Sequence, residues 1–271
     1  MPPALTDSTD SKPDPVARSG AATRTSTSSR NGVSGVVSFG RRILQVEALP
    51  VLIATIILVI VIGALRPRFL SFGNLHDVLQ QSVYVAILAA GLAFLIGMRE
   101  IDLSVGSVFA LSLIIGALLM RRGVNPWLAV TTAIALGGAM GMMNATLVQV
   151  IAIPAIVATL ATLSIFRGLA LALTDGQQVT GLPVTSPFFT VVGGNVFGFP
   201  VMAVVMIGIG ILLTAVLRLT PFGYRVRSIG SNPEAATFSG ISIPRVRVQA
   251  MVMMGLLGGV AGVLEIGRAH V

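Results

Sequence analysis

The chain has 271 residues, of which 54% are hydrophobic and only 10% are charged, and its mean hydropathy is +0.92. Soluble domains carry about 25% charged residues, so this composition predicts a polytopic membrane protein. The absence of cysteine excludes disulfides, thiolate nucleophiles and cysteine-ligated zinc. The formal net charge of +8 does not indicate a nucleic-acid partner, because the arginines lie in the N-terminal tail and between apolar runs, where membrane topology explains them.

Residues 1–42 are rich in Ser, Thr, Asp, Pro and Arg and nearly free of large apolar side chains, which predicts a disordered tail. Its basic residues favour a cytoplasmic location. The first apolar run begins too late for a secretory signal. The tail holds the single lysine, Lys12, with no glycine-rich loop near it, so the chain cannot form a phosphate-binding P-loop. We therefore expect no cofactor here, and a nucleotide that drives transport would have to bind another subunit.

Six apolar runs approach the roughly 20 residues that a transmembrane helix needs, and a seventh is cut short. They predict an all-α transmembrane helix bundle over residues 43–264. In chain order the runs are Leu49–Leu65, Val78–Ile96, Leu103–Met120, Trp127–Ile151, Ala155–Thr174, Val201–Leu217 and Val248–Leu264.

With the tail inside the cell, six crossings return the chain to the cytoplasm at Arg218, so the two most basic parts of the chain share one side. The longest outer loop is then Asp175–Pro200, whose Gly, Pro and Asn predict turns rather than a helix. Some arginines would face outward, against the positive-inside rule, and one span could therefore be a half-helix. These residues are Arg66, Arg68, Arg121 and Arg122.

Three charges lie between the second and third runs with almost no loop to hold them: Arg99, Glu100 and Asp102. At the centre of a span each would cost about 2.5–3.5 kcal/mol, so such residues pair with one another or face a polar cavity. Arg99 can pair with either acid, and Asp102 can cap a helix that begins at Leu103. One interpretation is a tight interfacial turn with its charges among the headgroups. The other is a polar element near the permeation path.

Arg167, within the fifth run, is a further intramembrane charge that could line the path. Snorkelling of its long side chain to an interface is the favoured alternative, because the end of the run is about two turns away. The candidate residues of the translocation path are therefore Glu100, Asp102, Ser104, Gly106 and Arg167.

The stretch Arg218–Arg247, named here the basic segment, carries five arginines and one acid between two apolar runs. Its middle predicts a short helix with defined ends. Asn232 is a good N-cap, Pro233 suits the first helical position, and Glu234 lies near the positive end of the helix dipole. Gly240 can supply the left-handed residue that ends the helix. Such a helix suits docking into a groove on a soluble partner, and an ordinary linker helix is the alternative.

Three blocks of this chain resemble the membrane permease subunit of ribose/xylose-type ABC sugar importers. They are EIDLSVGSVFALS (Glu100–Ser112), NATLVQVIAIPAIVATLATLSIFRGLALALTDG (Asn144–Gly176) and FGYRVRSIGSNPEAATFSGISIPRVR (Phe222–Arg247). The similarity covers most of the chain from about Phe69 onward. Many members of that family have Gly-Gly before the IDLSVG core, where this chain has Arg99-Glu100.

The resemblance implies a translocation pathway formed by two permease chains in a bacterial plasma membrane. A cytoplasmic ABC ATPase would drive the cycle, and an extracytoplasmic binding protein would deliver a monosaccharide. The short helix would be the element that enters the ATPase groove. The matching positions are Gly230, Asn232, Glu234, Ala235, Ala236 and Gly240.

Residues 265–271 read EIGRAHV, which one frame of a common sequencing adapter encodes. Since the family continues with further spans, we expect this end to be non-native and the true C-terminus to be missing.

Two other function classes remain open from the residues alone. An ion-coupled secondary transporter or channel could use Glu100, Asp102 and Arg167, but it would have no need for a docking helix. An intramembrane enzyme is disfavoured, because there is no cysteine, His76 and His270 lie far apart, and no catalytic constellation is present.

Overall fold

The computed structural model describes residues 49–196 and 198–268. The predicted tail, residues 1–42, and the last three residues of EIGRAHV lie outside this range. The chain divides into two units, residues 1–65 and 66–271. Of the first unit the structure describes one apolar helix, α2 (Leu49–Leu65).

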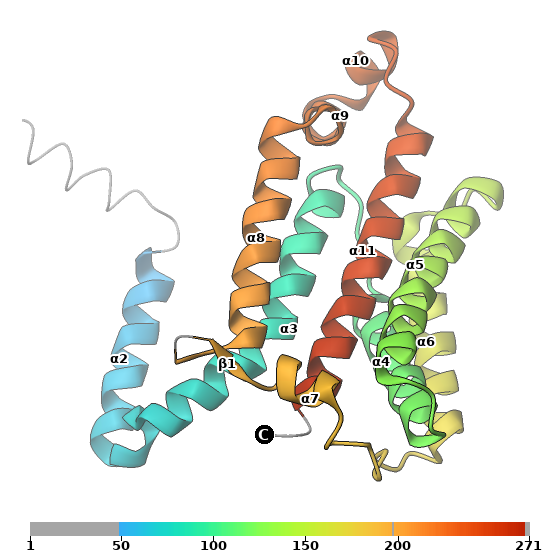
Figure 1. Ribbon diagram of the computed structural model, residues 1–271. Helices are drawn as coiled ribbons and strands as arrows, with labels where there is room; N and C mark the ends of the chain where they lie inside the picture. Colours follow the sequence, from blue (N-terminus) through green and yellow to red (C-terminus); the bar gives the residue numbers. More distant parts are fainter. Residues whose placement is uncertain (1–48, 197, 269–271) are drawn as a thin grey trace, which may run out of the picture. The chain divides into compact units, whose positions relative to one another are not determined.

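The second unit consists almost entirely of helices (Figure 1). The long apolar helices are α3 (Phe72–Ile96), α4 (Val105–Arg121), α5 (Pro126–Val150), α6 (Ala155–Thr174), α8 (Val201–Leu219) and α11 (Ile243–Gly267). The short elements are η1 (Pro67–Leu70), α7 (Pro187–Val192), β1 (Asn195–Val196), β2 (Phe199–Pro200), α9 (Pro221–Ser231) and α10 (Pro233–Phe238).

Five described helices are long and apolar enough to cross a membrane, namely α3, α5, α6, α8 and α11. Two further apolar helices, α2 and α4, have 17 residues each. In the second unit α3, α5 and α8 run toward the end that carries α9 and α10, and α4, α6 and α11 run back (Figure 1). The all-α transmembrane bundle expected from the sequence is confirmed, and the chain is a multi-pass membrane protein.

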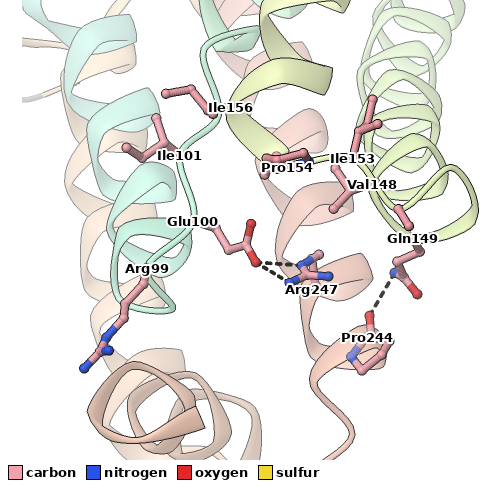
Figure 2. Close-up of a pocket in the computed structure, with 12 residues that line it drawn as sticks. Arg99, Glu100, Ile101, Val148, Gln149, Ile153, Pro154, Ile156, Pro244 and Arg247 are labelled. Carbon is pink, nitrogen blue, oxygen red and sulfur yellow. Dashed lines mark hydrogen bonds and ion pairs between the residues drawn. The ribbon is translucent and has the colours of Figure 1, made fainter.

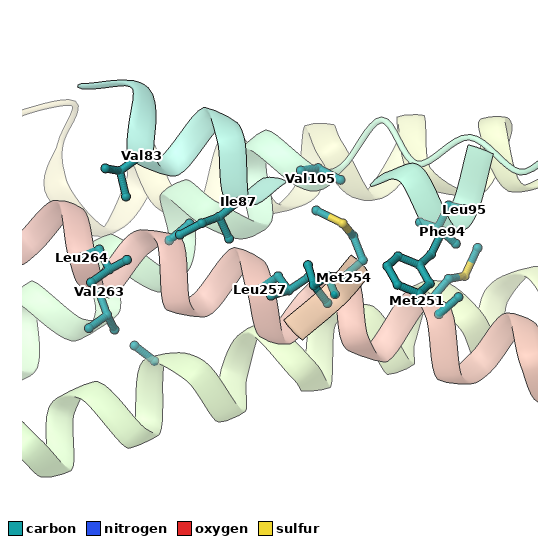
Figure 3. Packing of buried hydrophobic residues seen from close by; sticks show 14 of the residues in the cluster. Val83, Ile87, Phe94, Leu95, Val105, Met251, Met254, Leu257, Val263 and Leu264 are labelled. Carbon is teal, nitrogen blue, oxygen red and sulfur yellow. The ribbon is translucent and has the colours of Figure 1, made fainter. Parts of the chain in front are cut away.

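The helix α11 lies at the centre of the second unit, where α3, α4 and α5 pack around it. Its buried face includes Met251, Met254 and Leu257, which contact the same apolar cluster as Phe94 and Leu95 of α3 (Figure 3). It begins at Ile243 and ends at Gly267, so α11 has 25 residues. This is longer than the cut-short run that the sequence suggested.

Glycines bring the backbones of α5 and α11 into direct contact. A Cβ at Gly137 would overlap the carbonyl oxygen of Gly255, and a Cβ at Gly141 would overlap that of Met251. Small residues at membrane helix interfaces permit such close packing, since van der Waals contact is the main force between apolar helices in lipid.

Three local expectations need correction. The helix α3 begins at Phe72 rather than Val78, because Ser71 caps it by accepting a hydrogen bond from the Asn74 N–H. The stretch Asp175–Pro200 contains the short helix α7 and a two-stranded hairpin, β1 with β2, in addition to turns. The basic segment forms two helices instead of one, since Thr220 and Pro221 start α9 before α10.

Candidate functional site

The short helix α10 has the ends that the sequence predicted. The Asn232 side chain accepts a hydrogen bond from the Ala235 N–H at 3.0 Å, and Pro233 occupies the first helical position. Glu234 lies in the first turn. After the helix, Gly240 has a φ of 79°, in the left-handed region where glycine is favoured. These local predictions about capping are confirmed.

Most of α10 faces away from the rest of the chain. Ala236 is buried against the bundle, whereas Glu234 and Ala235 are exposed. Phe238, which is not among the residues predicted from the sequence, is 92% exposed. An exposed aromatic in a polar segment is a common anchor of protein interfaces. The available signal was an isolated aromatic among small polar residues, and only the structure shows that this residue is not part of the core.

The joint between α3 and α4, residues 97–104, lies next to the basic segment. The Arg99 side chain donates from Nε to the carbonyl oxygen of Gly230 at 2.8 Å and from Nη2 to that of Ser231 at 3.1 Å. Arg99 pairs with neither Glu100 nor Asp102, so that sequence-based expectation is wrong. The physical reason is that helix α9 ends beside Arg99 with unpaired carbonyl groups, and these attract a cationic donor.

Glu100 points the opposite way from Arg99 and pairs with Arg247 of α11 (Figure 2). Both Nε and Nη2 of Arg247 approach Glu100 Oε1, at 2.7 and 2.5 Å. The pair is largely shielded from solvent, with side chains 14% exposed for Glu100 and 23% for Arg247. Charge-assisted hydrogen bonds of this kind are stronger than neutral ones.

A cavity of about 690 Å³ opens beside this ion pair. Its walls come from the joint, from the turn between α5 and α6, and from the start of α11 (Figure 2). Gln149 donates a hydrogen bond to the carbonyl oxygen of Pro244 at 3.0 Å and so connects α5 to α11 across one wall. Ile153 and Pro154 contribute apolar surface.

Deeper along the joint, Asp102 and Ser104 form a buried polar network. Asp102 Oδ1 accepts hydrogen bonds from the Ser104 N–H at 2.8 Å and the Ser104 hydroxyl at 2.6 Å. Asn144 of α5 donates to Ser104 Oγ at 2.7 Å, and the Leu103 N–H donates to Thr159 of α6 at 3.1 Å. The network therefore joins the start of α4 to α5 and α6. Asp102 precedes a helix that begins at Val105, two residues later than expected.

The structure brings Glu100, Asp102 and Ser104 together in one joint but leaves the other two candidates apart. Gly106 is exposed in the first turn of α4, with open space where a Cβ would lie. Arg167 is exposed on α6, and no hydrogen bond or ion pair joins it to another described residue.

Within the described ranges, no group of three histidine, aspartate or glutamate side chains could hold a metal ion. Hydrogen bonds and an ion pair connect the joint to α5, α9 and α11.

Comparison with known proteins gives one family and a consistent set of relatives. A family model described as "Branched-chain amino acid transport system / permease component" matches residues 74–269. The ribose import permease protein of Bacillus subtilis (strain 168) is 37% identical over 214 residues, which cover 79% of this chain and 66% of the relative. No solved structure matches.

Two further relatives come from Escherichia coli (strain K12). Its ribose import permease protein is 33% identical, over 80% of this chain and 68% of the relative. Its D-allose transport system permease protein is 31% identical, over 78% of this chain and 65% of the relative. The chain thus spans about two thirds of the length of the curated relatives that it matches.

Proposed function

The chain belongs to the permease-component family of branched-chain amino acid transport systems, and on that premise we propose that it is the transmembrane subunit of an ATP-binding cassette importer for a monosaccharide. The ribose and allose names of its relatives support the choice of sugar class. The observation that carries the proposal is α10, a capped and exposed helix beyond the ends of the apolar helices.

We propose that α10 enters a groove on a cytoplasmic ABC ATPase. Three features support this role. Its ends are defined by its own residues, so it keeps its shape while being exposed. Ala235 presents a small surface that permits close approach, and Phe238 offers an apolar anchor. Glu234 adds a negative charge next to the helix N-terminus, which the helix dipole stabilises.

The energy source then lies outside this chain, which has no P-loop lysine. ATP binding to the ATPase would favour one arrangement of the two α10 helices, one from each permease chain, and hydrolysis would release that arrangement. The pathway would then open alternately to the two sides of the membrane, because the populations of the two arrangements shift. A second permease chain, an extracytoplasmic sugar-binding protein and a surrounding lipid bilayer complete the proposed assembly. A homodimer is the simplest form of the permease pair, and no nucleic acid takes part.

The proposed location is a bacterial plasma membrane, with the N-terminus and α10 on the cytoplasmic side. The cysteine-free sequence allows a direct test, because Ala235→Cys would introduce a single thiol. A membrane-impermeant maleimide should label this thiol in inside-out vesicles but not in intact cells. Labelling in intact cells would contradict the orientation.

The function itself is tested by reconstitution. The permease is placed in proteoliposomes with an ABC ATPase and a secreted sugar-binding protein. D-ribose and D-allose, each radiolabelled, are the probes. We expect uptake that requires ATP and stops with ADP. Uptake driven by a proton or sodium gradient without the ATPase would instead favour a secondary transporter.

A further inference from the structure

Arg99 has a backbone conformation that L-residues rarely adopt, with a φ of 63°. The left-handed region costs a non-glycine residue free energy, and it persists only where surrounding contacts enforce it. Here the turn is closed by the backbone hydrogen bond from the Glu100 N–H to the carbonyl oxygen of Leu95 at 2.9 Å, as at many helix C-termini. The Arg99 guanidinium adds two hydrogen bonds, to the carbonyl oxygens of Gly230 and Ser231. A cation at this position also interacts favourably with the negative end of the α9 dipole.

The backbones meet directly beside Arg99. A Cβ at Gly230 would overlap the carbonyl oxygen of Gly97, so the joint and the end of α9 lie in van der Waals contact. The rings of Phe94 and Phe222 stack with centroids 5.9 Å apart, and Ile229 is buried in the same core. The end of α3 and the helix α9 therefore form one packed unit immediately before α10.

Glu100 makes the corresponding contact on the other side of α10. Its partner Arg247 lies in the second turn of α11, the helix that follows α10 in the chain. Two adjacent residues of the joint thus contact both sides of α10. One contact is with Ser231, the last residue of α9, and the other is with Arg247, nine positions after the last residue of α10.

The polar contacts of α10 itself stay within the basic segment. Asn232 bonds to Ala235, Thr237 donates to Pro233, and Ser239 donates to Ala235. Among the described residues, the hydrogen bonds and ion pairs that connect the two sides of α10 to the joint are therefore those of Arg99 and Glu100.

We propose that Arg99 and Glu100 are positioning residues that keep the joint attached to α10 throughout the transport cycle. When α10 moves with the ATPase, the joint moves with it. The buried network then carries the displacement from Asp102 and Ser104 to Asn144 of α5, and from Leu103 to Thr159 of α6. This inference rests on the proposed function, because it assigns the residues through which ATP hydrolysis reaches the helices.

A charge-exchange experiment in the reconstituted transporter tests the Glu100–Arg247 contact. Glu100→Arg and Arg247→Glu should each lower sugar uptake per ATP hydrolysed by about tenfold, while the double exchange should restore most of it, as expected for contacting residues. Co-purification of the ATPase is measured for each variant. Arg245→Glu is the matched control, with the same charge change two positions away at an exposed site without an ion pair among the described residues. The Arg245→Glu variant should show the same sugar uptake per ATP hydrolysed as the wild type.

Arg99→Gly tests the other contact. This variant relieves the backbone strain and removes both hydrogen bonds to α9. We expect normal amounts in the membrane together with reduced uptake per ATP. A purely structural role for Arg99 predicts no change in that ratio.

Chemical cross-linking tests whether the contact stays closed. Glu100→Cys/Arg247→Cys creates the only two thiols in the chain. Without a linker, this double variant should show low sugar uptake per ATP hydrolysed. A short bis-methanethiosulfonate linker between the two thiols should restore that ratio, and a reductant that cleaves the linker should lower it again. If a charge-reversed variant fails to insert into the membrane, the cross-linking experiment by itself tests the contact between residues 100 and 247.

The outcomes separate the two proposals. Absence of ATP-driven uptake by the wild-type complex would refute the proposed function. With an active wild type, normal coupling in the single reversals would overturn the inference, and so would a linker that blocks uptake, because the contact would then have to open during the cycle.

Discussion

The basic segment and the joint both interrupt the apolar helices at the same end of the bundle, but they are held in different ways. The ends of α10 are stabilised by hydrogen bonds between residues three to five positions apart, such as Asn232 with Ala235. The joint is held by partners on other helices that lie 40 to 147 positions away in the chain. Arg99 reaches Gly230 across 131 positions, and Glu100 reaches Arg247 across 147.

This difference separates two tasks. A helix whose ends are capped by its own residues can present an exposed surface to a partner while a single side chain, Ala236, packs against the bundle. A joint held by distant helices responds when any of those helices moves. The first arrangement suits docking, and the second suits the transmission of movement.

The largest expected effect comes from the joint. Asp102→Ala removes the acceptor for the Ser104 N–H and hydroxyl, and buried unsatisfied groups cost about 1–3 kcal/mol each. We expect sugar uptake to be lost while the protein still inserts into the membrane, as measured by uptake and by the amount of membrane-embedded protein. Asp77→Ala, at an exposed position of α3, is the control and should transport normally. Normal uptake by Asp102→Ala would remove the joint from the mechanism.

Glu234→Arg addresses the docking side of the comparison. The substitution reverses the charge near the N-terminus of α10, where a cation opposes the helix dipole and a groove suited to a carboxylate would repel it. We expect ATP hydrolysis to continue while uptake per ATP falls by about tenfold, an effect typical of altered interfacial charge. Hydrolysis and uptake are measured in the same proteoliposomes. Wild-type uptake would argue against docking at this position.

Phe238→Ala tests the proposed docking surface of α10 more directly. Phe238 is so exposed that removing its side chain leaves no cavity in the fold. Truncation of an aromatic interface anchor costs about 2 kcal/mol or more, so ATPase affinity should fall by about thirtyfold or more. Titration of the ATPase onto permease in nanodiscs measures this affinity. Phe72→Ala, 78% exposed at the opposite end of α3, is the matched control. Equal effects of the two variants would contradict a specific anchor.

Asn232→Ala is expected to have the smallest effect. Loss of an N-cap costs about 1 kcal/mol, which should loosen α10 and raise amide hydrogen exchange over residues 233–240 by several-fold. Asn232→Ser, which retains a capping oxygen, should exchange nearly as slowly as the wild type. Unchanged exchange in Asn232→Ala would show that contacts beyond the cap determine the order of α10.

Much of the fold could be predicted from the sequence, because span length and hydrophobicity are local properties. The apolar runs coincide with seven helices, and the capping residues of α10 lie where the sequence indicated. The helix α9 was missed, since its arginines and glycines form no apolar period that marks a span. Phe238 was missed because exposure depends on where the surrounding chain lies.

Residue order alone determined that this is a helical membrane protein with a capped helix between two of its spans, since hydropathy and capping act over a few neighbouring positions. The sequence did not indicate which partners the three charged residues between positions 99 and 102 would have. Only the tertiary structure directed Arg99 to the end of α9, Glu100 to Arg247 and Asp102 into the interior. Helix packing decided these contacts, because it places distant carbonyl groups and charges within hydrogen-bonding distance of the joint.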